Sequence, residues 1–506
     1  MNKTEFQEIS PSEFFYRNRD LAGFSNPSRA LYSTIRELVE NSLDACDLFS
    51  IYPKVYVRLT GLENQSKEDV KEYTLVISDN GSGIPNEKIP LALGKVFFGS
   101  KFKLKQSRGM FGMGGTMSML YAQITTNKPI TITSSVDGKT YHRYRMIIDI
   151  EKNQPTVLDY SSGDSKGWRG TRIELNLMGD YLRSASRIVE YFNKIALVTP
   201  YAEIAFLDPM DRLFVYAKGT DQMPTPPTEV LPHPLGVDVE GLRRAIRSWK
   251  GGGIRSFLIK NFHRVGPGIA DKFLEYVMID PTRDPRTLSS EEMASLTNSL
   301  QTFGKFLPPD GRCLSPLGRE ILLTGINKEL NPEFADVAIR APAAYGGFPF
   351  VVEVGLAYGG QIKSDKLLLF RFANRIPLLY DEGSDIAWKV LMEDIDWNHY
   401  KVPMESPLVI ITHICSTKIP YKTVGKEYIS DRPEIERELK NAIKEVLRGL
   451  SLYLGKKSSM ENIQRKYNIY AKYLPLIAQF STSLADRKRK PNIQLLLGEG
   501  SLDIFT

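Results

Sequence analysis

From Pro27 to about Phe49, apolar residues recur every three or four positions, and this spacing predicts a long amphipathic helix. Asn26 suits the N-cap of that helix, and Pro27 suits its first turn. Strand-like alternation of apolar and polar residues follows, at residues 55–59, 73–77, 129–150 and 171–177. The first part of the chain is therefore expected to be of the α+β class, with a glycine-rich stretch from Asn80 to Gly115 in its middle.

Prolines interrupt this pattern at residues 224–234. They remove backbone donors and disfavour regular elements, so we place a domain boundary near residue 228. The next unit, to about residue 305, is expected to be small and helical, because two helical patterns flank the turn Val265-Gly266-Pro267-Gly268. A third unit of βαβ type is predicted by a helical stretch near 384–394 and by strand-like runs at 348–357, 366–373 and 408–415.

A final helix is predicted from Asp431, because Asp431 and Glu434 have capping-box spacing and Pro433 suits the first turn. Its apolar positions continue, with interruptions, to about residue 485. The chain is therefore expected to be a multidomain α+β protein with divisions at 1–228, 229–306, 307–470 and a helical extension or tail at 471–506.

Length and composition agree with this division. At ~150 residues per domain, a chain of 506 residues is expected to hold about three domains. Hydrophobic residues make up 42% and charged residues 25%, which excludes a largely disordered, collagen-like or coiled-coil protein. The net charge of +7 is compatible with an anionic partner but does not establish one.

The chain lacks the sequence signals of a membrane or secreted protein and of a histidine-based or zinc-based site. No run approaches the ~18 apolar residues of a spanning helix, and the polar N-terminus lacks a signal-peptide core, so a cytoplasmic protein without membrane contact is expected. The five histidines are scattered, and the three cysteines, Cys46, Cys313 and Cys415, show no CxxC spacing. We therefore expect neither a disulfide framework nor a structural zinc site.

Three polar side chains lie on one stripe of the predicted first helix. Glu37, Asn41 and Asp44 are spaced i, i+4 and i+7, so they project from the same side. One interpretation is a solvated helix face. The other is an acid–base carboxylate beside a carboxamide that binds a hard metal ion, because an amide oxygen suits magnesium and a glutamate can polarise water.

Two glycine-containing segments favour the second interpretation. Asp79-Asn80-Gly81-Ser82-Gly83 follows a predicted strand, where glycines bring the backbone close to a ligand and the carboxylate can accept from an exocyclic amine. The run Gly109-Met110-Phe111-Gly112-Met113-Gly114-Gly115-Thr116 leads directly into a helical pattern. Glycines before a helix N-terminus form a cradle for phosphate, because backbone N–H groups and the helix dipole both favour an anion.

This glycine run is neither a Walker A loop, which ends in GK[ST], nor a Rossmann fingerprint, which follows a strand directly. Taken in order, the motifs ExxxNxxDA, DxGxG and GxxGxG resemble those of the Bergerat fold of the GHKL ATPases, a superfamily that includes gyrase, the MutL proteins, the Hsp90 chaperones and histidine kinases. The resemblance implies an α/β sandwich with an N-terminal strap that binds ATP and Mg²⁺.

By that resemblance, Glu37 is the general base that activates water, Asn41 holds Mg²⁺, and Asp79 reads the adenine amine. Asp44 and Gly83 line the same site. The segment Gly99-Ser100-Lys101-Phe102 and the glycine run would form a lid over the phosphates, with contacts from Ser100, Lys101, Gly109, Met110, Phe111, Gly112, Met113, Gly114, Gly115 and Thr116. We interpret Lys103, Lys105 and Arg108 of this lid as solvated charges, and Glu40 and Asp47 as carboxylates of the helix surface.

A catalytic glutamate favours hydrolysis over the histidine kinases, which carry a phosphorylated histidine on a helical dimerisation unit. In the gyrase-like and MutL-like enzymes, a βαβ transducer domain follows the ATPase and sends a lysine back to the γ-phosphate. The matching segment here is Ser416–Glu427, in which Lys426 is the predicted catalytic and nucleotide-binding lysine and Lys422 is the alternative.

The helical insert resembles the helix-two-turns-helix module of DNA glycosylases and of a ribosomal protein, most closely at Phe262–Ala270. The order of ATPase, helix-two-turns-helix module and transducer, over roughly residues 5–470, is similar to that of the ATPase (B) subunits of the type IIB DNA topoisomerases. The aromatic segment Asp396–Tyr400 lies near that family's transducer motif but departs from it internally.

Positive charge is concentrated in the insert. Residues 241–264 contain no Asp or Glu and seven cations, namely Arg243, Arg244, Arg247, Lys250, Arg255, Lys260 and Arg264. We expect this patch to bind the backbone of double-stranded DNA without reading sequence, with an affinity that falls steeply with salt. A solvated helical face is the alternative.

The resemblance implies an ATP-hydrolysing subunit of a DNA topoisomerase, cytoplasmic and associated with chromosomal DNA. Two copies would dimerise on ATP binding and drive strand passage, for relaxation or decatenation, in an A2B2 heterotetramer with a separate DNA-cleaving A subunit. A mismatch-repair-like DNA clamp and a client-binding chaperone remain alternatives. The clamp should lack the helical insert, and the chaperone should show no salt-sensitive affinity for DNA.

Overall fold

The computed structural model describes residues 9–62, 69–99, 104–109, 113–403, 405–422, 425–489 and 491–493. The chain forms two compact units. The first comprises residues 1–396 and 404–446, and the second comprises residues 397–403 and 447–506.

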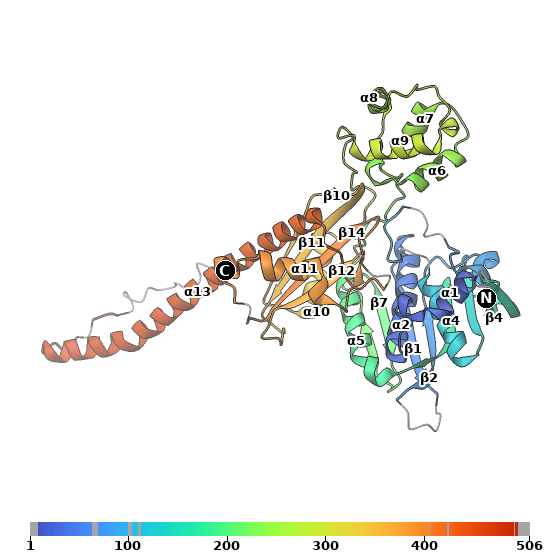
Figure 1. Cartoon of the computed structure of the whole chain (residues 1–506). Helices are drawn as coiled ribbons and strands as arrows, with labels where there is room; N and C mark the ends of the chain where they lie inside the picture. The colour runs from blue at the N-terminus through green and yellow to red at the C-terminus, as the bar shows by residue number, and fades with distance from the viewer. Residues whose placement is uncertain are drawn as a thin grey trace, which may run out of the picture. The chain divides into compact units, whose positions relative to one another are not determined.

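The first unit opens with an eight-stranded sheet in the order β5-β4-β3-β6-β2-β1-β7-β8 (Figure 1). Neighbouring strands are antiparallel except for β1 and β7, which are parallel. The strands are β1 (Lys54–Gly61), β2 (Lys71–Ser78), β3 (Ile130–Ser135), β4 (Thr140–Asp149), β5 (Gln154–Asp164), β6 (Gly170–Gly179), β7 (Glu203–Leu207) and β8 (Leu213–Tyr216).

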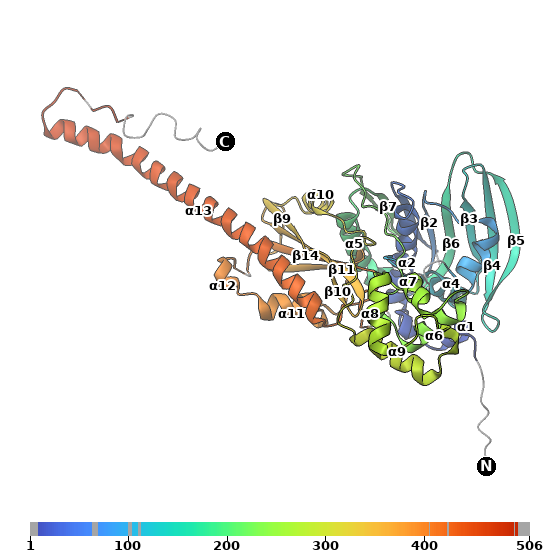
Figure 2. The same cartoon turned by 90° about the horizontal axis from the view of Figure 1, so that it is seen from above.

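Helices cover one face of this sheet, as Figure 2 shows for α4 beside β3 to β6. The long helix α2 (Pro27–Asp47) packs against α4 (Gly114–Thr126) and α5 (Tyr181–Val198), and the short helices α1 (Pro11–Arg17) and α3 (Ile89–Gly94) contact α4. Residues of β1 alternate between exposed and buried, as expected for a strand with only one face covered. The predicted first helix and its Asn26 cap are confirmed, because the Asn26 side chain accepts a hydrogen bond from the Arg29 N–H.

The insert is helical, as predicted, and has its own apolar core. Its helices are α6 (Val239–Ser248), α7 (Ile254–Asn261), α8 (Pro267–Val277) and α9 (Ser290–Thr302). Gly266 caps α8 and Pro267 begins it, so the turn between α7 and α8 is the glycine turn that the sequence indicated. A capping box between Ser289 and Glu292 fixes the start of α9.

A second sheet follows, in the order β10-β11-β14-β12-β13, with β9 paired to β11. Its strands are β9 (Phe334–Ile339), β10 (Ala343–Tyr345), β11 (Phe348–Tyr358), β12 (Leu368–Ala373), β13 (Ile376–Pro377) and β14 (Leu408–Ser416). β12 and β14 are parallel, and the chain between them includes the short helices α11 (Ile386–Lys389) and α12 (Trp397–Tyr400) and a π-turn at Val390–Asp394. The βαβ prediction is confirmed, although the helical stretch predicted near 384–394 is broken.

The two sheets share one apolar core within the first unit. Helix α10 (Arg319–Leu330) precedes the second sheet, and its Ile321 and Ile326 belong to the same buried cluster as Ile411 of β14 and Leu197 of α5. A Cβ atom on Gly325 would lie 1.8 Å from the Leu197 carbonyl oxygen, so glycine allows α10 to approach α5 closely. The second sheet is therefore packed against the helical layer that carries α2.

The chain closes with α13 (Pro433–Leu484), a helix of 52 residues. Apolar residues of its first turns are buried at helical spacing, among them Ile435, Leu439, Ile443 and Leu450. Beyond Leu450 nearly all of its side chains are exposed. Among the helices that the structure describes, we find none with enough length and apolar content to cross a bilayer.

Candidate active site

Glu37 lies in the middle of α2, against the first turn of α4. It is only 8% exposed. A Cβ atom on Gly114 would lie 1.8 Å from Glu37 Oε2, and one on Gly115 would lie 3.1 Å from Asn41 Nδ2. The two glycines at the start of α4 therefore let this helix begin directly against the polar stripe of α2 that the sequence predicted.

The first turn of α4 is suited to an anionic ligand. Met113 is its N-cap residue, and a methionine side chain has no oxygen or nitrogen with which to cap the N–H groups of the turn. Thr116, which is 2% exposed, belongs to the same turn. These N–H groups and the helix dipole together provide positive potential beside Glu37 and Asn41, as a phosphate group requires.

Asp79 follows directly on β2 and is held by three donors. Its Oδ2 accepts from Ser42 Oγ of α2 at 2.9 Å, and its Oδ1 accepts from the Gly81 and Thr171 N–H groups at 2.9 and 3.0 Å. Burial is the main reason that the pKa of this carboxyl is raised, and the three hydrogen bonds oppose the rise. The contacts fix the orientation of a buried acceptor at the end of the strand.

Gly83 is required by both its backbone and its surroundings. Its φ of +70° lies in the left-handed region, and a Cβ atom would lie 2.2 Å from the Ser135 carbonyl oxygen. The glycine thus allows the chain after Asp79 to pass against the end of β3.

Lys426 reaches the same place from the second sheet. It lies in the loop between β14 and α13, and its Nζ is 3.4 Å from Glu37 Oε1. The loop is fixed to α2 on either side of the lysine, because Arg36 donates to the Gly425 carbonyl oxygen at 3.3 Å and Arg29 pairs with Glu427. Lys426 is 5% exposed, whereas the alternative, Lys422, is exposed.

Two residues that the sequence analysis left out complete this cluster. Glu40 was expected on the helix surface, and that prediction is wrong, because its side chain is 1% exposed. Its Oε2 lies 3.5 Å from Lys426 Nζ, and its Oε1 lies 3.7 Å from Arg36 Nε. Arg36 also pairs with Glu37 at 2.7 Å. Burial disfavours the charged form of Arg36, but Glu37 and Glu40 nonetheless raise its pKa.

Asp44 lies on the same helix but in a second buried cluster. Arg108 Nη1 contacts Asp44 Oδ1 at 3.1 Å and Asp47 Oδ2 at 2.7 Å, and Arg375 of the second sheet contacts Asp47 Oδ2 at 2.9 Å. The predictions that Arg108 is solvated and that Asp47 lies on the surface are wrong, since the two residues are 3% and 6% exposed. Burial lowers the pKa of Arg108, but its two aspartates raise it well above the ordinary value.

This second cluster joins three parts of the first unit. Gln106 and Ser315 exchange two hydrogen bonds, and the Asn374 side chain donates to the Ser107 carbonyl oxygen at 3.1 Å. The stem of the predicted lid is therefore attached both to α2 and to the second sheet. Of the other predicted lid residues, Gly109 and Met113 are described, and Ser100, Lys101, Met110, Phe111 and Gly112 lie outside the described residues.

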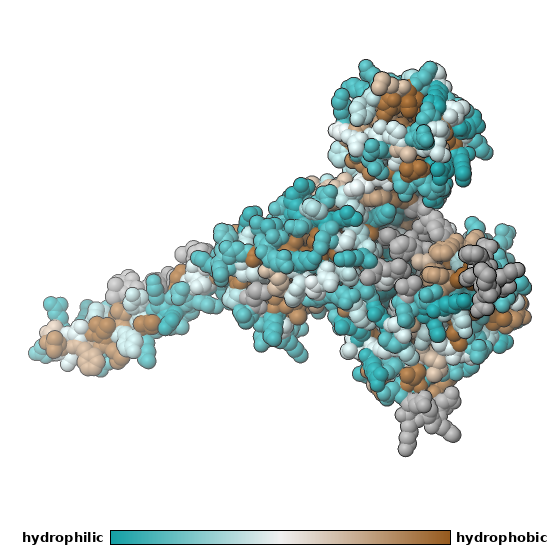
Figure 3. Space-filling view, in the orientation of Figure 1, coloured by the Kyte–Doolittle hydropathy of each residue, from teal (hydrophilic) through white to brown (hydrophobic). Residues whose placement is uncertain are grey.

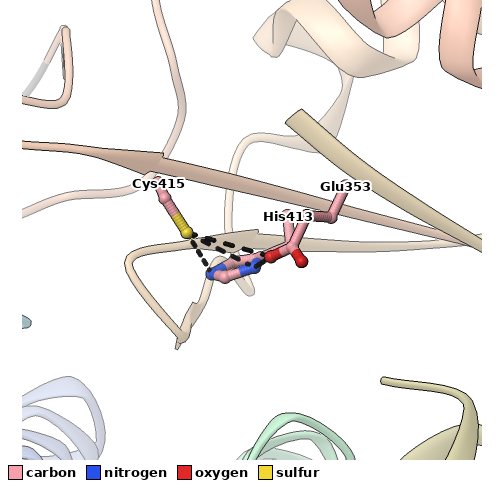
Figure 4. Close-up of side chains that lie close together, drawn as sticks. All are labelled: Glu353, His413 and Cys415. Carbon is pink, nitrogen blue, oxygen red and sulfur yellow. Dashed lines mark hydrogen bonds and ion pairs between the residues drawn. The ribbon is translucent and has the colours of Figure 1, made fainter. Parts of the chain in front are cut away.

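A third buried group lies inside the second sheet. Glu353 of β11 faces His413 of β14, and Cys415 is two residues further along β14 (Figure 4). The ligand atoms of these three residues lie within 4.8 Å of one another, a grouping that the widely spaced cysteines and histidines did not predict. All three side chains are fully buried.

Protein contacts already use the ligand atoms of this third group. The Arg375 N–H donates to His413 Nε2 at 3.0 Å, so Nδ1 carries the proton and donates to Glu353 Oε2 at 2.7 Å. Glu353 also accepts from the Leu317 and Gly318 N–H groups, and burial raises the pKa of the Cys415 thiol well above its ordinary value. The group is a structural network that fixes Arg375, which in turn pairs with Asp47.

A hollow of about 500 Å³ lies on the opposite face of the first sheet, lined by outward-facing residues such as Thr131 and Arg172. Ile132 and Ile173, which alternate with them, face the core. None of the predicted site residues lines this hollow. The site at Glu37 therefore lies on the helical side of the sheet, under α4.

The fold and the three motifs define a class of nucleotide-binding ATPase. A family model described as "Histidine kinase-, DNA gyrase B-, and HSP90-like ATPase" matches residues 26–152, which include Glu37, Asp79 and α4. Among solved structures, the B-subunit of DNA gyrase from Myxococcus xanthus matches 87% of this chain and 95% of that chain, at 10% identity and a TM-score of 0.42, too distant to add to the assignment. The chain is therefore a nucleotide-binding ATPase of the GHKL class.

The second sheet and the full-length relatives identify the family. A model described as "Topoisomerase VI B subunit, transducer" matches residues 309–466. The B subunits of type 2 DNA topoisomerase 6 are 40% identical in Metallosphaera sedula, over 99% of this chain and 95% of that relative, and 41% identical in Sulfurisphaera tokodaii, over 95% and 90%. The chain belongs to the family of topoisomerase VI B subunits and is the ATPase subunit of an ATP-dependent DNA topoisomerase.

Proposed function

We propose that this site binds ATP with Mg²⁺ and that hydrolysis there is sensed by the second sheet. The observation that carries the proposal is the 3.4 Å contact between Lys426, from the loop after β14, and Glu37 of α2. A cation from one domain thus meets the proposed general base of another inside a buried site. The proposed domain limits remain 1–228, 229–306 and 307–470, with a helical extension at 471–506.

Glu37 is proposed as the base that takes a proton from the attacking water. Its Oε1 is occupied by Arg36 and Lys426, and its Oε2 lies beside Gly114, at the helix end proposed to hold the phosphates. Oε2 is therefore the oxygen placed to orient water toward a terminal phosphoryl group. Asp79, with its carboxylate fixed by Ser42, Gly81 and Thr171, is proposed to accept from the adenine amine.

Asn41 is proposed to hold Mg²⁺. Magnesium prefers hard oxygen ligands and keeps several waters, so one protein carboxamide together with nucleotide phosphates is a fitting donor set. Asn41 lies one turn after Glu37 and is in contact range of Gly115 at the start of α4, where the phosphates would lie. When bound, the ion would neutralise charge on the phosphate oxygens.

Lys426 is proposed to exchange its carboxylate partners for the γ-phosphate. The buried carboxylates of Glu37 and Glu40 lie within 3.5 Å of its ammonium group, so it already occupies the side of the site where a terminal phosphate would add negative charge. Because Lys426 is attached to β14, the position of the second sheet would depend on whether that phosphate is present.

We propose that ATP binding brings two chains together through their N-terminal parts. The aromatic residues Phe14 and Tyr16 of α1 are 42% and 44% exposed, and Phe97 nearby is 48% exposed. Phe97 lies against Phe15 of the same helix. Exposed aromatic side chains of this kind, gathered at one place, favour a protein interface.

The insert is proposed to contact the backbone of duplex DNA through fewer cations than the sequence suggested. Arg243 pairs with Glu240, Arg255 pairs with Asp271, and Arg264 donates to the Pro308 carbonyl oxygen. The four exposed cations of the patch are Arg244, Arg247, Lys250 and Lys260. These side chains supply a charged surface without base-reading groups, which suits sequence-independent binding.

The A subunit of an A2B2 assembly is proposed to bind the later part of α13. Large apolar side chains are exposed along it, including Ile463, Tyr470, Ile477, Phe480 and Leu484. They form the brown surface toward the end of this helix in Figure 3. A helix with so many exposed apolar residues favours a protein partner.

Sedimentation of the purified chain tests nucleotide-driven dimerisation. We expect a mass of one 57.2-kDa chain without nucleotide and of two chains with Mg²⁺ and a non-hydrolysable ATP analogue. Asp79→Asn, which removes the proposed adenine acceptor, should keep the chain monomeric under both conditions. With the A subunit added, the mass should correspond to two copies of each chain. An unchanged mass on adding the analogue would contradict the proposed dimerisation.

A further inference from the structure

Glu40 is a buried carboxylate to which none of the proposed steps gives a role. It lies on α2, three residues after Glu37, and is 1% exposed. Neither of its oxygens has a hydrogen-bond partner among the described residues. Its neighbours are instead two cations at ion-pair distance, Lys426 Nζ at 3.5 Å and Arg36 Nε at 3.7 Å. A carboxylate in this position is stabilised by charge and not by close hydrogen bonds.

Glu37 and Glu40 share the same two cations. Arg36 lies 2.7 Å from Glu37 Oε1, and Lys426 lies 3.4 Å from that same oxygen. The four side chains form two cations and two anions, all of them buried. Removing the charge of Glu40 would leave both cations balanced by Glu37 alone, which would draw them onto the carboxylate that has to orient water.

We propose that Glu40 is a positioning residue that holds the Lys426 ammonium group and the Arg36 guanidinium group so that Glu37 remains available as the base. This inference rests on the proposed roles of Glu37 and Lys426. Glu40 would carry part of the positive charge that otherwise falls on Glu37, and it would give Lys426 a second partner within reach of the γ-phosphate. Burial raises the pKa of Glu40, in keeping with a carboxylate that depends on these cations.

The surroundings of Glu40 allow its effect on pH dependence to be stated. The titratable groups facing it are Arg36, Glu37, Asp44 and Tyr32 of α2, Tyr191 of α5, and Lys426 and Tyr421 of the loop after β14. Burial raises the pKa of all three tyrosines, so they stay neutral near pH 7. Replacing Glu40 by glutamine removes a negative charge beside Glu37, which should lower the pKa of Glu37 and move the acidic limb of kcat to lower pH.

Steady-state ATP hydrolysis by the full chain tests the proposal through a double-mutant cycle. We expect Glu40→Gln to lower kcat by about tenfold with KM within twofold, because the lysine and the base are misplaced in the transition state. In a Lys426→Met background the same change should cost less than twofold. Glu40→Asp should recover part of kcat. Glu203→Gln, which removes a half-exposed carboxylate on the far side of the sheet, is the matched control.

Melting temperatures keep the cycle interpretable. Lys426→Met alone leaves Glu40 with Arg36 as its remaining partner, so the double variant should melt at a higher temperature than Lys426→Met. Equal losses of kcat from Glu40→Gln in both backgrounds, or an unshifted acidic limb, would overturn the positioning role of Glu40. Full turnover in Lys426→Met would instead overturn the proposed role of Lys426, so the two failures are distinct.

Discussion

Glu37→Gln is expected to lower ATP turnover by ~10²–10⁴-fold, the range for loss of a general base, while nucleotide binding stays within about threefold of wild type. Glutamine preserves the shape of a side chain that is wedged against Gly114, where a larger change would disturb the start of α4. The substitution removes the carboxylate charge that faces the proposed phosphate position. Turnover is measured by phosphate release, and binding by calorimetry with a non-hydrolysable analogue.

Glu203→Gln serves again as the control, since it makes the same chemical change at a surface position. It should leave turnover unchanged. Retained turnover in Glu37→Gln would remove Glu37 from the role of base. Loss of binding together with turnover would show that the residue acts in holding the nucleotide and not in activating water.

Lys426→Met is the second variant with a large expected effect. We expect hydrolysis to fall by ~10²-fold, the order seen when a preorganised cation or donor is removed from a developing charge. Lys426 is 5% exposed and its Nζ lies 3.4 Å from Glu37 Oε1, so no bulk-solvent cation can replace it easily. Its φ of +56° also indicates that the loop is held in this conformation against the usual preference of a lysine.

Lys422→Met is the matched control for Lys426→Met. Lys422 lies in the same loop but is exposed, and the change should alter hydrolysis by less than about twofold, as for surface charges in general. The two variants are compared by phosphate release at saturating ATP. If Lys422→Met gave the larger loss, the proposed sensor would move to Lys422.

Local signals allowed the elements around the site to be predicted. Asn26, Pro27 and the apolar spacing of α2 are sufficient for a capped helix whatever lies around it, and they placed Glu37 and Asn41 on one side. Gly83 was likewise recognisable, because its φ of +70° requires a residue type that the sequence shows directly. The strand β5 was not predicted, since it is an edge strand with nearly every residue exposed and thus shows no alternation.

Burial of charge could not be predicted from the sequence. Glu40 and Asp47 belong to a helix that could have shown these carboxylates to water, and they are buried only because Lys426 and Arg375 arrive from more than 300 residues away in the sequence. Helical spacing says which residues share a side but not what covers that side. Pairs of buried cations and carboxylates at such separations are a property of the folded first unit.

ATP hydrolysis at Glu37 is proposed to drive passage of duplex DNA in an assembly with an A subunit. The most direct measurement is relaxation of supercoiled DNA by the purified chain, with and without an A subunit, in the presence of ATP and Mg²⁺. We predict relaxation that requires both chains and ATP and that is lost with Glu37→Gln. Relaxation by this chain alone, or none when the A subunit and ATP are both present, would contradict the proposed mechanism.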